Sequence, residues 1–589
     1  MNSGDSAQKI KVSDYIVDFL YDQGVRQVFE LSGGMITHLL DSLHQDGRIR
    51  SISVHHEQAG AIAADAVGRI TRVPGVALAT SGPGATNLLT GIASFYFDSS
   101  PGVIITGQVN RDERRGSRPI RQLGFQECDI VDMARPVTKA AREIVSPREI
   151  PSALREAFAL SLDGRPGPVL LDIPMDVQRS YLTPEDLALP DSATSLQPRA
   201  APESAAIGEG LRILAEARRP LILAGGGIRA SDTHQPFLDF VHRTGIPVVH
   251  SLMGVDLLAA GDPLRVGMIG SYGNRWANLA LDHSDAVLVL GSRLDIRQTG
   301  ADVAAWRARR SIIHVDCEPG EINNRVTGVL PILADMHAFF AAALAALPAT
   351  RPDRCGWLAE VNGLRKRWPD TQELVASEAG AGGINPNILI HQIAARSGGA
   401  GAYVVDVGQH QMWAAQSLDL AEGQRFLTSG GLGAMGFALP AAIGAALSTT
   451  RPVVLIAGDG GFQVNIQELE TVVRNRLAIK MIIFNNECHG MVRQFQQSFF
   501  EQRYASSWWG YTAPDFVAIA RAYGISSRFV STPGDAAEAL DWLWQKPMEP
   551  ALLEVAIPSL TNAYPKIAFG SPMSEMEPLP ESAPVPPAR

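Results

Sequence analysis

Short runs of apolar, often β-branched residues alternate with amphipathic segments along most of the chain. In the clearest example, an apolar run over 453–457 ends in Gly-Asp-Gly at 458–460. An amphipathic segment follows, and a second apolar run over 481–484 ends in Asn-Asn at 485–486. Strand, helix and strand in this order predict two parallel strands joined by a right-handed crossover.

Two oxygen-bearing side chains follow these strands. If the strands are neighbours, Asp459 and Asn486 both lie at the carboxyl edge of the sheet, where ligands of open α/β sheets bind. A carboxylate and an amide oxygen suit Mg²⁺, which uses few protein ligands and takes phosphate oxygens for the rest. The glycines allow backbone N–H groups to approach a phosphate. A glycine turn and a polar loop without a ligand are the alternative interpretation.

The same alternation predicts three α/β domains, each a doubly wound parallel sheet, over residues 1–185, 205–348 and 386–560. The segments at 183–205 and 349–385 are interpreted as linkers, the second with some helix. The tail over 561–589 is rich in Pro and Glu from Glu577, and we expect disorder there. The expected strands are 28–31, 49–54, 76–80, 103–106 and 169–172 in the first domain, 221–224, 286–290 and 312–315 in the second, and 404–405, 453–457 and 481–484 in the third.

Net charge, cysteine spacing and the length of apolar runs argue against several classes of protein. A net charge of −10 over 589 residues argues against a nucleic-acid binder. The four cysteines have no metal or disulfide spacing and are interpreted as reduced thiols of a cytoplasmic protein. The polar N-terminus lacks a signal core, and no apolar run reaches the ~20 residues of a membrane helix.

Glu57 and Met435 indicate a function only when they are read together with the sequence motifs that flank them. Glu57 follows a strand and begins a helix, where a negative charge is favoured by ~0.3–1 kcal/mol. Alone it would be a surface glutamate, and Met435 alone would be a core methionine. With their flanking motifs they resemble acetolactate synthase (acetohydroxyacid synthase), a family of thiamine-diphosphate (ThDP) enzymes. The blocks that carry the resemblance are 54–61, 81–87, 106–109, 125–127, 409–416, 428–444, 458–460 and 485–492.

The resemblance implies a pyrimidine-binding, a central and a diphosphate-binding domain. It also implies a homodimer or homotetramer, with the cofactor between the first domain of one subunit and the third domain of another. The catalytic residues would be Glu57, which activates the pyrimidine, and Gln126. The cofactor-binding residues would be Gly33, Gly34, Gln409, His410, Gly433, Met435, Gly460, Gly461, His489, Gly490 and Met491. The metal ligands would be Asp459, Asn486 and the backbone carbonyl of Cys488.

The central domain is similar to the FAD-binding domain of the family. FAD would be structural, because the reaction has no redox step, and the alternative is a domain that has lost this ligand. The residues at FAD-binding places are Gly226, Gly227, Arg293, Asp316 and Asp335. The residues facing the substrates would be Phe125, Arg297, Val492 and Phe495. Arg297 would meet an acceptor carboxylate, for which a planar guanidinium is suited, and a surface ion pair is its alternative role.

The activity that the resemblance implies is decarboxylating carboligation of 2-oxo acids, with two pyruvate molecules giving 2-acetolactate and CO₂. Glu57 argues against the glyoxylate carboligase branch, and Gln108-Val109-Asn110 stands where simple decarboxylases have paired histidines. Phe495 replaces a family tryptophan, so a preference for 2-oxobutyrate is not expected. Two alternatives stay open: transfer of the acetyl unit to another ketone, such as a nucleotide-linked keto-sugar, and a non-catalytic ThDP-fold binding protein. The sequence leaves a regulatory subunit open.

The segment 110–124 is longer than in typical synthases and carries five arginines. It lies between two motifs that border the cofactor. A solvated charged loop is one interpretation, and a phosphate-recognising lid is the other. The arginines are Arg111, Arg114, Arg115, Arg118 and Arg121.

Overall fold

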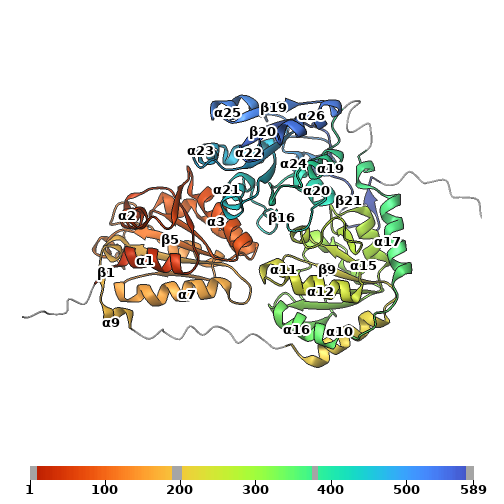
Figure 1. The fold of residues 1–589 in the computed structure, drawn as a ribbon, viewed down its shortest axis with the longest axis horizontal. Coiled ribbons are helices and arrows are strands. Elements are labelled where there is room, and N and C mark those ends of the chain that lie inside the picture. Colours follow the sequence, from red (N-terminus) through yellow and green to blue (C-terminus); the bar gives the residue numbers. More distant parts are fainter. Residues whose placement is uncertain (1–8, 189–201, 375–382, 569, 579–589) are drawn as a thin grey trace, which may run out of the picture.

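The computed structural model describes residues 9–188, 202–374, 383–568 and 570–578 (Figure 1). Within these residues the chain forms three domains, each built on a six-stranded parallel sheet. This confirms the predicted fold class of three doubly wound α/β domains. Alternate residues of each strand face opposite layers, so Val28 packs in one apolar cluster and its neighbour Phe29 in another. Among the described residues, no helix has both the length and the apolar character needed to cross a bilayer.

The sheet of the first domain has the strand order β3-β2-β4-β5-β7-β6. Its order reverses between β2 and β4, the two strands that lead into the turns at Gly33 and Gly82. The strands are β2 (Gln27–Glu30), β3 (Arg50–Ser53), β4 (Gly75–Ala79), β5 (Gly102–Gln108), β6 (Ala140–Glu143) and β7 (Pro168–Pro174). The main helices are α1 (Val12–Asp22), α2 (Thr37–Asp46), α3 (Glu57–Thr71), α5 (Leu89–Phe97) and α7 (Ile150–Leu162).

The third domain repeats this topology, with the order β16-β15-β17-β18-β20-β19. As predicted, β17 and β18 are parallel neighbours, with Gly458 paired to Phe484. The strands are β15 (Ala402–Val405), β16 (Arg425–Leu427), β17 (Val453–Gly458), β18 (Ile479–Asn485), β19 (Ser526–Val530) and β20 (Ala551–Ala556). The main helices are α19 (Pro386–Arg396), α20 (Gln409–Ser417), α21 (Ala438–Ser448), α22 (Asp459–Val464), α23 (Leu469–Arg474), α24 (Gly490–Phe499), α25 (Phe516–Ala522) and α26 (Pro533–Leu543). The predicted turn at Asp459 is therefore the first residue of a helix.

The central domain has a different order, β11-β10-β9-β12-β13-β14, which reverses between β9 and β12. The strands are β9 (Pro220–Ala224), β10 (Val248–His250), β11 (Arg265–Met268), β12 (Ala286–Leu290), β13 (Ser311–Asp316) and β14 (Leu330–Leu333). The main helices are α10 (Ser204–Glu216), α12 (His234–Thr244), α13 (Arg275–His283) and α16 (Met336–Ala346), and α17 (Cys355–Arg367) follows in the expected linker.

The first and third domains meet along α3 and α21 (Figure 1). A side chain on Gly444 would overlap the backbone oxygen of Ala63, so glycine is needed for this close approach. At the far end of α3, Arg69 donates to the backbone oxygen of Thr428 at 2.8 Å and is ion-paired with Asp65 and Asp98. The two sheets are therefore held together within one chain.

The segment that follows the third domain packs on the rest of the molecule. Thr561 and Asn562 are buried, and Ile567 N–H donates to the Ser271 backbone oxygen of the central domain at 2.9 Å. Strands β21 (Lys566–Ile567) and β22 (Met576–Glu577) pair, so the disorder expected from Glu577 does not include that residue. Residues 579–589 lie outside the described part.

Candidate active site

The third sheet brings polar groups together at the point where its strand order reverses. Strand β15 leads into Gly408 and the helix α20, and β17 leads into Asp459 and the helix α22. Open α/β sheets bind ligands at such a reversal, and helix N-termini carry free N–H groups that favour anions. Asn486 follows the next strand, β18, as the sequence predicted.

Three oxygen atoms converge beside this reversal. Asn486 Oδ1 lies 3.2 Å from Asp459 Oδ1 and 2.8 Å from the backbone oxygen of Cys488. Acceptors without a donor between them repel one another, and a cation bound among them would remove that repulsion. One carboxylate, one amide and one carbonyl oxygen form the hard donor set that Mg²⁺ prefers. The described residues contain no cluster of three or more His, Cys, Asp or Glu side chains able to hold a metal ion.

Asp459 is buried and oriented by a residue that the sequence did not single out. The Tyr511 hydroxyl donates to Asp459 Oδ2 at 2.9 Å, which leaves Oδ1 turned toward Asn486. Burial raises the pKa of Asp459 to about 6, although the Tyr511 hydrogen bond stabilises the charged form. A nearby cation would provide a positive charge that stabilises the ionised form of this buried carboxylate.

The predicted diphosphate residues surround the same edge. His410 Nε2 is buried and has no hydrogen-bond partner among the described residues. Burial lowers the pKa of His410 to about 3, so the ring is a neutral polar group available to a ligand. A Cβ at Gly460 would lie 2.8 Å from the His489 ring and 3.2 Å from the Tyr511 hydroxyl oxygen. Gly461 and Met491 lie in the first turns of α22 and α24.

The loop over 429–436 carries Gly433 and Met435, and a buried acid fixes it. Asp406 accepts from Gly436 N–H at 3.0 Å and from Ala438 N–H at 2.9 Å, and burial raises the pKa of Asp406 to about 6. Met435 is 37% exposed, so it is not a core methionine and stands free to contact a ligand. Asp406 is not among the predicted residues, although its place directly after an apolar strand is a usable signal.

Glu57 is buried rather than on the surface, with 6% of its area exposed. It begins α3, and Asn87 Nδ2 donates to Glu57 Oε2 at 2.9 Å. Glu57 Oε1 lies beside Gly84, where a Cβ would approach it to 3.1 Å. The carboxylate is thus held at the carboxyl edge of the first sheet, beside the turn that follows β4.

The remaining predicted residues of the first domain adjoin this position. A side chain at Gly33 would overlap Thr80, and one at Gly82 would lie 2.9 Å from the Cβ of Gln126. Gly34 begins a short 3₁₀ helix. Gln126 has a positive φ of 65°, which is uncommon for a residue other than glycine. The structure therefore places the Gly33 and Gln126 turns on either side of the strand end that precedes Gly84.

A cavity lies where the three domains meet, and all five predicted FAD residues line it. Gly226 and Gly227 follow β9, and Arg293 follows β12, so they flank the reversal of the central sheet. Asp316 and Asp335 lie at the ends of β13 and at the start of α16. The mixture of glycine turns, guanidinium groups and carboxylates suits a ligand with phosphate and hydroxyl groups.

The predicted substrate residues are not all brought together by one chain. Arg297 lines the central cavity, whereas Phe125 and Gln126 are absent from its lining. Phe125 is 79% exposed, and Val492 and Phe495 are about half exposed on α24. These apolar side chains need a further covering surface to form a closed pocket.

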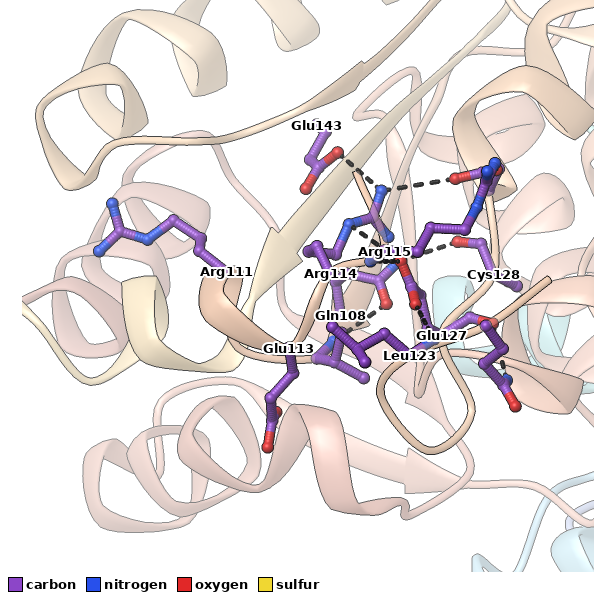
Figure 2. Close-up of polar contacts among 12 residues, drawn as sticks. Gln108, Arg111, Glu113, Arg114, Arg115, Leu123, Glu127, Cys128 and Glu143 are labelled. Atoms are coloured by element: carbon purple, nitrogen blue, oxygen red, sulfur yellow. Dashed lines mark hydrogen bonds and ion pairs between the residues drawn. The ribbon is translucent and has the colours of Figure 1, made fainter. Parts of the chain in front are cut away.

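Three of the five arginines of the insertion are ion-paired with acids of this chain, and Figure 2 shows two of them, Arg114 and Arg115, with their partners. Arg114 lies 3.0 Å from Glu143 and also contacts Asp129, while Arg115 pairs with Asp129. The remaining interactions are Arg111 with Asp176, and Arg118 with the backbone oxygens of Arg114 and Arg115.

Glu127 closes the base of this loop. Its carboxylate accepts from Arg115 N–H at 2.7 Å and from Leu123 N–H at 2.9 Å, and the side chain is 5% exposed (Figure 2). The backbone N–H bonds and the charge of Arg114 lower the pKa of Glu127 despite its burial. The loop is thus held by its own ion pairs, which weakens the interpretation as a phosphate-recognising lid.

One sheet edge with donors that suit a cation and an anion, and a buried carboxylate on a second sheet of equal topology, are typical of one class of enzyme. The domains of thiamine pyrophosphate enzymes match in order: the N-terminal TPP binding domain over residues 10–133, the central domain over 207–344 and the C-terminal TPP binding domain over 406–555.

Full-length relatives define the family. The chain is 36% identical to the acetolactate synthase large subunit of Cyanidium caldarium, over 95% of each chain. It is 36% identical to the acetolactate synthase isozyme 2 large subunit of Escherichia coli strain K12, over 96% of this chain and 98% of the relative. It is 35% identical to the chloroplastic acetolactate synthase 2 of Nicotiana tabacum, over 96% and 85%. The chain belongs to the acetolactate synthase family of ThDP-dependent enzymes.

Proposed function

We propose that this enzyme joins two molecules of pyruvate to give 2-acetolactate and CO₂, with ThDP and Mg²⁺ as cofactors. The observation that carries the proposal is the convergence of Asp459 Oδ1, Asn486 Oδ1 and the Cys488 backbone oxygen at the reversal of the third sheet. Such a donor set suits the cation that accompanies a diphosphate. The names of the full-length relatives support the substrate class.

The chain's own residues have separable tasks in this proposal. Bound ThDP supplies the electron sink for the bond that breaks when CO₂ leaves. Glu57 would share a proton with a ring nitrogen of the pyrimidine, and Asn87 holds the Oε2 atom of Glu57 in place. Met435 supports the cofactor from the loop that Asp406 fixes. Phe125 and Gln126 line the pocket and exclude water.

The proposed subunit arrangement is based on apolar side chains that are exposed in the single chain. We propose that Glu57 of one subunit meets the Asp459 edge of another, so that the active unit is at least a homodimer. The exposure of Phe125, Val492 and Phe495 in the single chain supports this arrangement. Because several relatives are named large subunits, a smaller partner subunit is part of the proposal.

We also propose that FAD occupies the central cavity without a redox role, held by the glycine turns after β9 and by Arg293, Asp316 and Asp335. A yellow purified protein whose visible spectrum is unchanged during turnover is the expected result. A colourless protein that gains no activity when FAD is added would contradict this part alone.

Product analysis tests the reaction. With pyruvate, ThDP and Mg²⁺ we expect one acetolactate and one CO₂ for every two pyruvates. The same assay with added ketones, including 2-oxobutyrate and a nucleotide-linked keto-sugar, identifies any preferred acceptor. Release of CO₂ with acetaldehyde as the sole product would indicate a simple decarboxylase, and bound ThDP without CO₂ release would indicate a non-catalytic binding protein.

A further inference from the structure

Behind the proposed metal site, three buried side-chain amides and the backbone of Ala563 form a continuous chain of hydrogen bonds. Asn486 Nδ2 donates to Gln409 Oε1 at 3.2 Å. Gln409 Nε2 donates in turn to Gln494 Oε1 at 3.0 Å. The Gln494 amide is bound at both ends by Ala563, which donates its N–H to Oε1 at 2.9 Å and accepts from Nε2 at 3.0 Å. The three side chains are each at most 7% exposed.

The orientation of each amide in this series of hydrogen bonds is set by Ala563, at the end opposite to the proposed metal site. The backbone N–H of Ala563 can only donate and its backbone oxygen can only accept, so Ala563 fixes which end of the Gln494 amide faces Gln409. Gln494 Oε1 then requires the nitrogen of Gln409, and Gln409 Oε1 requires the nitrogen of Asn486. Asn486 Oδ1 consequently points at Asp459 and Cys488. Reversing the Asn486 amide would place two oxygens 3.2 Å apart at Gln409.

We infer that Gln494 is a positioning residue for the proposed metal site, and that the backbone of the docked C-terminal segment orients the ligand Asn486 through Gln494 and Gln409. The inference rests on the magnesium site proposed above. It assigns the side chain of Gln409 to orienting the metal ligand, in place of the predicted contact with the diphosphate. Partners behind a metal ligand commonly change metal affinity by about 10- to 100-fold.

Two further features of the same region fit this role. A side chain on Gly490 would overlap Gln409 Oε1 and lie 2.7 Å from Asn486 Nδ2, so only glycine leaves room for the amide chain. The segment that supplies Ala563 is anchored independently, because Arg493 donates to the Thr561 backbone oxygen at 3.1 Å and also binds Asn562. Trp413 Nε1 adds a hydrogen bond to the Asn562 backbone oxygen at 3.4 Å.

Gln494→Met tests the inference, because methionine keeps the volume and removes the amide. The matched control is Gln497→Met, on the same helix, whose side chain contacts Asn562 and Arg493 but does not join the amide chain. The readout is the affinity for Mn²⁺, titrated by electron paramagnetic resonance at saturating ThDP, with near-ultraviolet circular dichroism to verify folding. We expect at least tenfold weaker Mn²⁺ binding for Q494M and wild-type affinity for Q497M.

The possible results separate the two proposals. A wild-type protein that binds no Mn²⁺ overturns the metal site itself. Wild-type affinity in Q494M, or equal losses in both variants, overturns the positioning role and leaves the metal site standing. If Q494M does not fold, Gln494→Asn carries the test, since a shorter amide cannot bridge Ala563 and Gln409. It should then bind Mn²⁺ at least threefold more weakly, and unchanged affinity would overturn the role.

Discussion

The first and third domains have the same strand order, yet their carboxyl edges carry different chemistry. In the third, helix α22 begins directly after β17, at Asp459, and α20 begins at Gln409, after a three-residue connection from β15. In the first, the strands at the reversal lead into the glycine turns at Gly33 and Gly82, and the acid comes from beyond the next strand, as Glu57. The topology thus determines where a ligand binds, and the residues after each strand determine which part of the ligand is bound there.

Glu57→Gln should give the largest effect on turnover with little effect on cofactor binding. Glutamine keeps the shape and can still accept from Asn87, but it cannot hold the proton needed at the pyrimidine. We expect kcat to fall about 10²- to 10⁴-fold, measured as acetolactate formation, with the ThDP dissociation constant changed less than threefold by calorimetry.

A buried acid elsewhere in the same sheet provides the control. Glu30 ends β2, is buried and accepts hydrogen bonds from Ser51 and Ser53, and it is not among the predicted site residues. Glu30→Gln should change kcat by less than about threefold, because residues that share no partners act independently. A parallel loss of ThDP binding and turnover in E57Q would indicate that Glu57 supports the fold instead of the reaction.

Asp459→Asn should have the opposite signature, a loss of cofactor binding. The substitution removes the carboxylate charge at the proposed metal site and preserves its shape. We expect about 100-fold weaker Mg²⁺-dependent ThDP binding, by analogy with the 10- to 100-fold effects of nearby partners. Tyr511→Phe, which keeps the carboxylate and removes one hydrogen bond, should cost about 1 kcal/mol, or roughly fivefold. Equal effects of these two variants would contradict the metal role of Asp459.

The sequence placed Asp459 and Asn486 on one sheet edge correctly for a local reason. Asp459 and Asn486 directly follow apolar strands, so periodicity alone places them on one edge. Tyr511 and Gln494 reach the site from distant segments, and no local pattern marks them. Strand β6 was missed because its residues are all half-buried, and β14 because it is an edge strand that contains Pro331.

The third domain is also fastened to the preceding linker, which gives a pH-dependent prediction. His391 contacts Asp370 in the linker at 2.9 Å and Asp419 at 2.7 Å. Burial lowers its pKa, but the hydrogen bonds and charges of the two acids outweigh burial and raise the pKa of His391 to about 9. A raised folded-state pKa gives stability that is complete below the unfolded value near 6.5 and is lost as the pH rises through about 9.

We expect the free energy of unfolding to fall by about 1–2 kcal/mol between pH 6.5 and 9.5 through this group, after allowing for its partial exposure. Thermal unfolding scans across that range measure the change. His391→Gln should be less stable at pH 6.5 and should lose this part of the pH dependence. If the free energy of unfolding of this variant depends on pH as steeply as that of the wild type, other groups cause the dependence.

The smallest effect should come from the insertion, where the two domains differ after their fourth strand. Strand β18 leads directly into the turn that contains Asn486 and Cys488, whereas β5 leads into the loop that contains Arg114. Arg114 is ion-paired with Glu143 and Asp129 of its own chain, so its charge is already compensated by the protein, although its Nη1 is buried without a hydrogen-bond partner among the described residues. Arg114→Ala should lower the free energy of unfolding by about 1 kcal/mol or less. It should change the KM for every ketone acceptor by less than about twofold, since its partners are all on the protein.

Arg121→Ala at the exposed part of the loop is the control and should change neither quantity. A selective rise in KM for a phosphate-bearing ketone in R114A would restore the lid, because it would mean that the substrate displaces the acids now bound to this arginine.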